Sequence, residues 1–208
     1  MLLADGSGVY TYNPKLVSVD LHAFLRKVWE GDRARQAVGR DPARATQAVA
    51  AYQEARSLYG GLLLQGTEQH YAWPDELPDE LAEVTLREQY EREERRVAES
   101  LADALRALGR VAEAVLVYRD LLTNPGPPDG ERQEDEVREA HACTLFACYA
   151  QLGDLAGLDD AWLALETSMA RLDAEVGMRT PTVPSDATRA RFEAIRRTLV
   201  SPAATVGD

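Results

Sequence analysis

The sequence predicts an all-α protein built from pairs of helices, and three observations lead to this prediction. Hydrophobic residues recur with helical periodicity from about residue 20 almost to the end of the chain. Ala, Leu, Glu and Arg, which favour helices, dominate a composition with only 7% aromatic residues. Two segments share one layout, in which a helix ends at Leu-Gly and the next helix begins directly after it. We therefore expect antiparallel helix pairs stacked on one another.

The N-terminus is the exception to the helical pattern. Residues 6–12, GSGVYTY, alternate like a β-strand after a Gly-rich turn. Because we find no other segment with this alternation, we expect the strand to have no partner in this chain. Residues 1–12 are thus interpreted as a detached arm, a short N-terminal strand remnant of another domain.

A helical hairpin is predicted to follow. Asp20 is the expected N-cap of its first helix, and Asp41 and Pro42 open the second, which stops at Gly60-Gly61. The first helix carries one apolar stripe, expected to be buried: Leu21, Phe24, Leu25, Val28 and Trp29. The second has its own expected buried face: Ala45, Ala48, Val49, Tyr52, Ala55 and either Leu58 or Tyr59.

A long connection (62–80) follows, and we expect Tyr71 and Trp73 to pack it down. One helix is then predicted over residues 78–109, ended by Gly109. Its C-terminal half has a clear apolar stripe: Val97, Ala98, Leu101, Ala102, Leu105 and Leu108. Further helices are expected over 110–123, 134–153, 155–177 and 184–199, the last with Ser185 as N-cap, before a fraying tail at 201–208.

A weak internal repeat refines the fold class. Leu108-Gly109 and Leu152-Gly153 lie 44 residues apart, each between two predicted helices. Helix pairs that recur every 34 to 47 residues are typical of tetratricopeptide-like and related repeats. The spacing includes the break NPGPPDG (124–130), so the underlying unit is shorter if that segment is an insertion. We predict a tetratricopeptide-like helical repeat over residues 13–200.

Charge is distributed unevenly along the chain. The net charge is −12, which argues against nucleic-acid binding by the chain as a whole. Residues 13–60 and 179–199 each carry a net +3, and residues 65–178 carry −16. The simple interpretation is a solvated surface; the alternative is that the basic ends face an acidic neighbour, or the acidic middle a basic partner. Candidate partner-facing residues are Tyr71, Trp73, Tyr90, Arg26, Lys27, Arg33 and Arg35.

We find none of the usual sequence signs of catalysis. The phosphate loop, H-E-x-x-H, G-x-S-x-G and paired CxxC motifs do not occur. His22, His70 and His141 lie on separate segments with no obvious acidic or nucleophilic partner. Cys143 and Cys148 would point about 140° apart on a helix, which disfavours a disulfide or a shared metal. We predict no catalytic residues, no cofactor and no metal, and hence no enzyme.

Two further expectations concern location and the charged helix. No apolar run approaches the roughly 18 residues that span a bilayer, and the N-terminus lacks the layout of a signal peptide. We therefore expect a cytoplasmic protein without a membrane partner. The stretch EREERR (91–96) is expected to be an exposed helix stabilised by pairs such as Glu91–Arg95, with a partner-binding face as the alternative.

Four motifs, in order, resemble those of one known family. GSGVYTYNPKLVSVDLHAF (6–24) is similar to the last hairpin strand of a winged helix followed by a linker and a helix entry. AVAAYQEARSLYGGLLLQG and SLADALRALGRVAEAVLVYRDLL resemble the central helices of that family, and LDAEVG followed by PSDATRARFEAI its C-terminal motif. The chain thus resembles, over residues 4–199, the bacterial transcriptional activator domain (BTAD) of antibiotic-regulatory-type (SARP-like) activators.

The resemblance implies a function as well as a fold. It implies a non-enzymatic regulatory and oligomerisation module of a transcription activator, which contacts the transcription machinery (RNA polymerase) and self-associates. DNA would be bound only through a separate winged-helix domain. The segments MRTPTV (178–183) and NPGPPDG depart from the family pattern. A stand-alone tetratricopeptide-like interaction scaffold and, further off, a small-molecule sensor domain are the alternatives.

Overall fold

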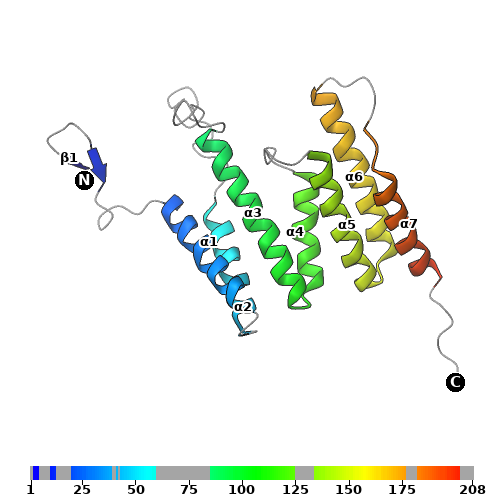
Figure 1. Ribbon diagram of the computed structural model, residues 1–208, viewed down its shortest axis with the longest axis horizontal. Helices are drawn as coiled ribbons and strands as arrows, with labels where there is room; N and C mark the ends of the chain where they lie inside the picture. Colours follow the sequence, from blue (N-terminus) through cyan, green and yellow to red (C-terminus); the bar gives the residue numbers. More distant parts are fainter. Residues whose placement is uncertain are drawn as a thin grey trace. The chain divides into compact units, whose positions relative to one another are not determined.

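A computed structural model describes residues 2–4, 10–12, 20–38, 41, 43–59, 85–124, 134–176 and 182–201 of the chain. These residues form seven α-helices and one two-stranded hairpin (Figure 1). The chain divides into two compact units, Met1–Gly61 and Leu62–Asp208. The predicted all-α fold class is confirmed, since every element longer than three residues is a helix.

The N-terminal strand has a partner, contrary to the prediction. Strand β2 (Tyr10–Tyr12) pairs in antiparallel register with β1 (Leu2–Ala4), so that Leu2 lies opposite Tyr12. The expectation of an unpaired strand is therefore wrong. Three residues are too few to show alternation, and the Gly-rich turn at 6–8 was the signal for a hairpin. The pairing removes the ground on which residues 1–12 were interpreted as a remnant.

Helices α1 (Asp20–Ala37) and α2 (Ala43–Leu58) form the predicted hairpin in the first unit. Asp41 begins α2 as expected, because its carboxylate accepts a hydrogen bond from the backbone N–H of Ala43 at 3.1 Å. The expected face of α2 is buried, with Tyr52 fully enclosed. Gly31 lies so close to Tyr52 that a Cβ on Gly31 would approach the tyrosine ring to 2.5 Å.

The predicted stripe of α1 is only partly correct. Phe24 and Val28 are buried, but Leu25 is 37% exposed and Trp29 is 59% exposed. At about 100° per residue, Trp29 is turned roughly 140° from Phe24, whereas Gly31 lies within about 20° of it. The buried face of α1 therefore runs through small residues, Gly31 and Ala34, and leaves Trp29 outside.

The described residues of the second unit form five helices: α3 (Leu86–Ala107), α4 (Val111–Thr123), α5 (Glu134–Leu152), α6 (Leu155–Val176) and α7 (Asp186–Val200). Helix α3 begins later than predicted. Thr85 has extended backbone (φ −71°, ψ 161°) and caps the helix. Its hydroxyl accepts a hydrogen bond from the backbone N–H of Glu88, and the Glu88 carboxylate accepts one from the backbone N–H of Thr85. The expected start at residue 78 is therefore wrong.

The core of the second unit matches the sequence pattern. Val97, Leu101 and Leu105 of α3 are each at most 4% exposed, whereas Leu108 is half-buried. They belong to a core that α4, α5 and α6 share, with Leu122, Leu145, Phe146, Leu158 and Leu165 fully buried. Among the described helices, none is long and apolar enough to cross a membrane.

Both Leu-Gly junctions adopt the same turn. Gly109 and Gly153 have positive φ, +74° and +68°, which suits glycine because it lacks a Cβ. The N–H of Arg110 donates to the carbonyl of Leu105 at 2.9 Å, and that of Asp154 to Tyr149 at 3.0 Å. Each junction is thus a Schellman motif, which turns the chain sharply between two helices.

Helix α7 is anchored by a carboxylate of α5. Glu139 accepts hydrogen bonds from the backbone N–H of Ser185 at 2.9 Å and from the hydroxyls of Ser185 and Thr188. Ser185 is also the N-cap, as predicted, since its hydroxyl accepts from the N–H of Thr188. Further along α7, Phe192 stacks on Trp162 of α6 with ring centroids 4.6 Å apart. These contacts hold α7 against α5 and α6.

Candidate functional site

The four predicted cations of α1 lie on one helix but in different surroundings. Arg26, Arg33 and Arg35 are exposed. Lys27 is half-buried and forms ion pairs with Glu30 at 2.9 Å and with Glu54 of α2 at 3.0 Å. The hydrogen bonds to these two carboxylates raise the pKa of Lys27. Lys27 therefore connects α1 to α2, and the exposed cations of α1 are the three arginines.

Trp29 and Arg33 form a stacked pair on that surface. They lie one turn apart on α1, and the Arg33 guanidinium carbon is 5.3 Å from the centroid of the indole ring. An arginine at this distance is attracted by the electron-rich face of the ring. The pair presents a large apolar ring and a positive charge together, with Trp29 59% exposed.

A pocket of about 450 Å³ opens beside this pair, between α1 and α2. On the α2 side, the Arg44 guanidinium donates to the Gln47 side chain at 2.6 Å and lies 3.4 Å from Asp41. Two arginines from two helices thus reach the same pocket. Its described lining is Trp29, Glu30, Arg33, Ala34, Ala37, Arg44 and Gln47.

Sequence reasoning found part of this surface. Arg33 was predicted to face a partner, but Trp29 was predicted to be buried, and Arg44 and Gln47 were not among the predicted residues. The available signal was helical geometry, because Trp29 lies far around α1 from Phe24. Tyr71 and Trp73 lie outside the described residues. Tyr90 on α3 is half-buried, and burial raises its pKa.

One histidine does have an acidic partner, contrary to the prediction. The Nε2 atom of His141 on α5 lies 2.9 Å from the Glu99 carboxylate on α3, and Arg95 lies 3.8 Å from the same carboxylate. The two partners are 42 residues apart, so the sequence did not show them as neighbours. His141 is 8% exposed, which makes this group a contact between helices rather than an open site.

The cysteines and the other metal-ligating groups are dispersed. Cys143 and Cys148 are free thiols, and Cys148 is fully buried, which raises its pKa. Within the described ranges, no three His, Cys, Asp or Glu side chains are grouped so as to hold a metal ion.

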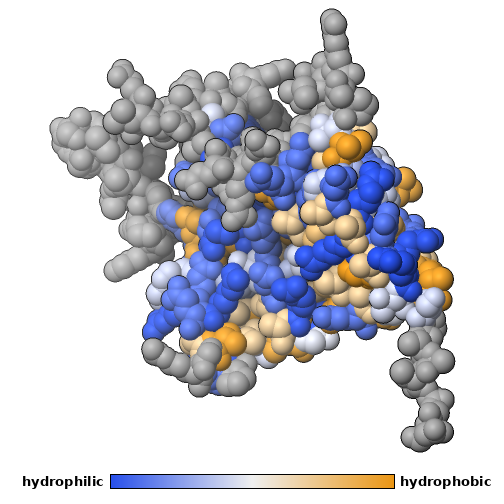
Figure 2. Space-filling view, turned by 45° about the vertical axis from the view of Figure 1, so that its right-hand side comes forward, coloured by the Kyte–Doolittle hydropathy of each residue, from blue (hydrophilic) through white to orange (hydrophobic). Residues whose placement is uncertain are grey.

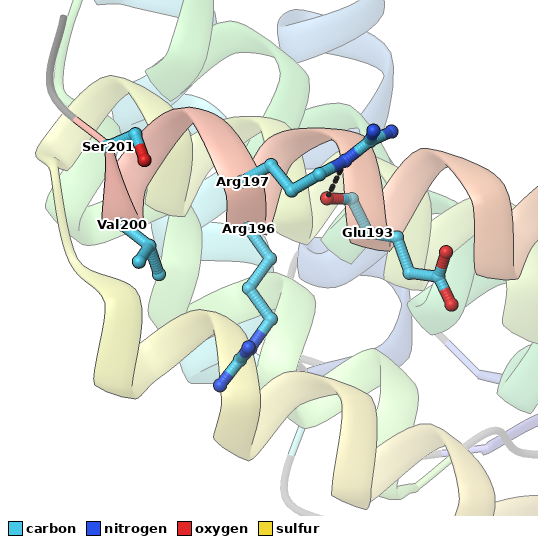
Figure 3. A pocket seen from close by; sticks show the side chains of 5 residues that line it. All are labelled: Glu193, Arg196, Arg197, Val200 and Ser201. Atoms are coloured by element: carbon cyan, nitrogen blue, oxygen red, sulfur yellow. Dashed lines mark hydrogen bonds between the residues drawn. The ribbon is translucent and has the colours of Figure 1, made fainter.

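A second hollow, of about 410 Å³, lies at the C-terminal end of α7 (Figure 3). Arg196 in its wall is held by a paired contact with Asp159 of α6 at 2.8 and 3.3 Å. Arg197 turns back to donate to the carbonyl of Glu193 at 3.3 Å. Val200 and Ser201 complete the described lining. Both arginines are thus engaged in contacts within the unit.

The surface of the second unit is mixed. In the view that brings α6 and α7 forward, hydrophilic residues are spread over the face and hydrophobic residues form small separate groups between them (Figure 2). Leu116, Leu163 and Val183 are exposed by more than half but come from three different segments. Single exposed apolar residues of this kind are ordinary for a protein surface.

Comparisons with family models, curated proteins and solved structures find no match to this chain. The assignment of a function therefore depends on the chain's own residues and geometry.

Proposed function

We propose that this protein is a non-enzymatic regulatory module of a bacterial transcription activator. It acts through protein–protein contacts, and a separate winged-helix domain binds DNA. Support comes from the four ordered motifs that resemble the bacterial transcriptional activator domain, over residues 4–199. The proposed partners, RNA polymerase and a second copy of the protein, follow from that resemblance.

The finer fold assignment belongs to the same proposal. We assign helices α1 to α6 to three tetratricopeptide-like pairs, followed by α7. The two Schellman turns at Gly109 and Gly153 support this, since each connects consecutive helices in the same way. A second shared feature is a hydrogen bond of 2.7 Å from a buried tyrosine to an aspartate of the preceding helix, Tyr52 to Asp32 and Tyr118 to Asp103. Repeats of this kind present extended surfaces suited to binding proteins.

One observation carries the proposed mode of action: Trp29 lies exposed under Arg33 at the mouth of a pocket. Tryptophan and arginine are enriched among the residues that dominate protein–protein binding energy. An indole with most of its surface in water gains free energy when a partner covers it. The same surface lacks the nucleophile, base and orienting group of a catalytic constellation among its described residues.

A stand-alone interaction scaffold is the second candidate, and the N-terminal hairpin favours it. Because β2 pairs with β1, this strand has a partner within this chain. Both candidates share the protein-binding surface and differ in whether binding activates transcription.

Transcriptional activation separates the two candidates. Residues 1–208 would be joined to an unrelated DNA-binding domain whose operator lies upstream of a weak bacterial promoter driving a reporter. The proposed function predicts reporter transcription well above the level given by the DNA-binding domain by itself. Transcription at that baseline, with the fusion present at equal amount, would contradict the activator assignment and leave the scaffold.

A further inference from the structure

We propose that the pocket between α1 and α2 binds an acidic peptide segment that carries an apolar side chain, with Trp29 contacting the apolar group and Arg33 and Arg44 the carboxylates. The proposal rests on the proposed function in one respect, that this surface contacts a protein. It goes further by naming the chemistry of the partner.

The apolar part of the pocket is an indole ring and two small residues. Trp29 is 59% exposed, and Ala34 and Ala37 lie one and two turns further along α1. Alanines leave room where longer side chains would fill the space. An incoming apolar side chain would gain about 25 cal/mol for each Å² of apolar surface removed from water. The ring therefore supplies an anchor for one apolar group.

The charged part of the pocket is positive. Arg33 and Arg44 both line it, one from each helix. Glu30 supplies the carboxylate among the lining residues, and its negative charge is offset by Lys27, whose Nζ lies 2.9 Å from the Glu30 carboxylate oxygen. The Arg44–Asp41 pair is about half exposed on both sides, and such surface pairs contribute little and exchange readily. Carboxylates of a partner can therefore engage the two guanidinium groups through charge-assisted hydrogen bonds.

The dimensions suit a few side chains of a peptide. A volume of about 450 Å³ lies in the range of small binding pockets, roughly 300–1,000 Å³. The two arginines come from different helices, so an occupant that engages both must present more than one acidic side chain. An extended or helical peptide with an apolar residue between acidic ones meets this requirement.

Nucleic acid fits the same surface less well. Residues 13–60 carry a net charge of only +3, enough to neutralise few phosphates. Glu30 and Glu54 share one cation, Lys27, so one carboxylate charge on this helix pair is left to repel a phosphate backbone. A peptide can place its carboxylates at the two arginines and avoid these groups, whereas the regular charge spacing of a duplex cannot.

Fluorescence anisotropy at physiological salt tests the proposal with the full chain. The probe is a labelled nine-residue peptide with four glutamates on each side of a central phenylalanine. Comparison peptides replace the phenylalanine by serine, or every glutamate by lysine. We expect the probe to bind, the serine peptide to bind several-fold more weakly, and the lysine peptide not to bind.

Variants assign the binding to the pocket. We expect Arg33→Gln and Arg44→Gln each to weaken binding about tenfold, as for loss of one charge-assisted hydrogen bond, and Trp29→Ala by a similar factor. Arg191→Gln, on an exposed arginine of α7, is the matched control and should leave binding unchanged. Circular dichroism confirms that each variant keeps its helical content.

Several results would overturn the proposal. The proposal is contradicted if the probe does not bind or if the lysine peptide binds equally well. It is also contradicted if the three pocket variants and the Arg191 control have equal affinity, or if a labelled duplex binds more tightly than the probe.

Failure of the proposed function gives different results. A fusion that does not activate the reporter while peptide binding depends on the pocket contradicts the activator assignment only. A fusion that activates equally with Trp29→Ala and Arg44→Gln, in the absence of peptide binding, contradicts the pocket only.

Discussion

The helix pairs α1–α2 and α3–α4 share an internal bond and differ in the surface around it. In each pair a buried tyrosine of the second helix donates to an aspartate of the first at 2.7 Å, Tyr52 to Asp32 and Tyr118 to Asp103. The net charges of the two pairs differ little, with +2 over residues 20–58 and −1 over residues 86–123. Common packing thus supports different surfaces, and the α1–α2 pair exposes a tryptophan, Trp29, under Arg33.

The largest expected effects test whether both pairs depend on their cores. Phe24→Ala should lower the free energy of unfolding by about 3–5 kcal/mol, and Leu105→Ala by about 2–5 kcal/mol, because both side chains are about 1% exposed. Urea denaturation followed by circular dichroism measures both. Gln53→Ala and Gln89→Ala, at exposed positions of α2 and α3, are the controls and should stay within about 0.5 kcal/mol. Equal losses at core and control positions would show that the cores are misplaced.

The shared tyrosine–aspartate bond gives a direct test of the likeness between the pairs. Tyr52→Phe and Tyr118→Phe remove only a hydroxyl, so each should cost about 1–2 kcal/mol, as for a hydrogen bond to a charged acceptor. We expect similar losses, measured by denaturant unfolding of each variant. A loss at one tyrosine and none at the other would break the comparison, because the bond would then support one pair only.

Alkaline pH sharpens the same test at Tyr118. Burial and, second, the hydrogen bond to Asp103 raise the pKa of Tyr118. The unfolded chain has the ordinary tyrosine pKa of about 10, so it loses this proton first as pH rises. The stability that Tyr118 contributes is therefore present below about pH 10 and is lost above it. Unfolding free energies between pH 8 and 11 should fall more steeply for the native chain than for Tyr118→Phe; parallel curves would contradict this.

Helix α7 lies outside the helix pairs and tests whether a carboxylate, that of Glu139, stabilises its attachment to α5. Burial raises the pKa of Glu139, but the hydrogen bonds from Ser185 and Thr188 outweigh it and leave the pKa lowered. Glu139→Gln should cost about 1 kcal/mol, as for the loss of a helix cap, and should increase amide exchange in α7. In the native chain this contribution should be present above about pH 4.3 and lost as the pH falls further. Unchanged exchange in α7 would show that the aromatic stack with Trp162 holds it instead.

The smallest expected effect concerns Trp29. Trp29→Ala should change the free energy of unfolding by less than about 0.5 kcal/mol, because the side chain is 59% exposed. The measurement is the same denaturation as for Phe24→Ala, one and a half turns earlier on the same helix. A loss of several kcal/mol would show that Trp29 is part of the core. It would then not be the exposed anchor on which the proposed partner surface depends.

The sequence predicted helix identity well because apolar periodicity and capping residues act locally. The cores around Tyr52 and Leu105 and the caps at Asp41 and Ser185 all follow from such local patterns. Errors arose where a distant or competing contact decided the outcome. The start of α3 was misplaced because helix-forming residues continue upstream of the Thr85 capping box.

The candidate site was harder to predict than the fold. Trp29 was misplaced although its angle from Phe24 on α1 sets it apart from Gly31 and Ala34, the small residues of the buried face where Tyr52 lies close to Gly31. Arg44 and Gln47 share the pocket only after α2 folds back on α1. The Glu99–His141 contact likewise joins residues 42 positions apart. Such pairings are set by packing between helices, which single-helix periodicity does not encode.

The central claim is that this chain contacts proteins and leaves DNA recognition to another domain. Titration of labelled duplexes of different sequence, at low and then physiological salt, tests it most directly. The chain's acidic middle repels phosphate, so we expect weak, sequence-independent binding at low salt that is lost at physiological salt, where dissociation constants would be about 10⁻⁴ M or weaker. Sub-micromolar, sequence-selective duplex binding at physiological salt would contradict the account.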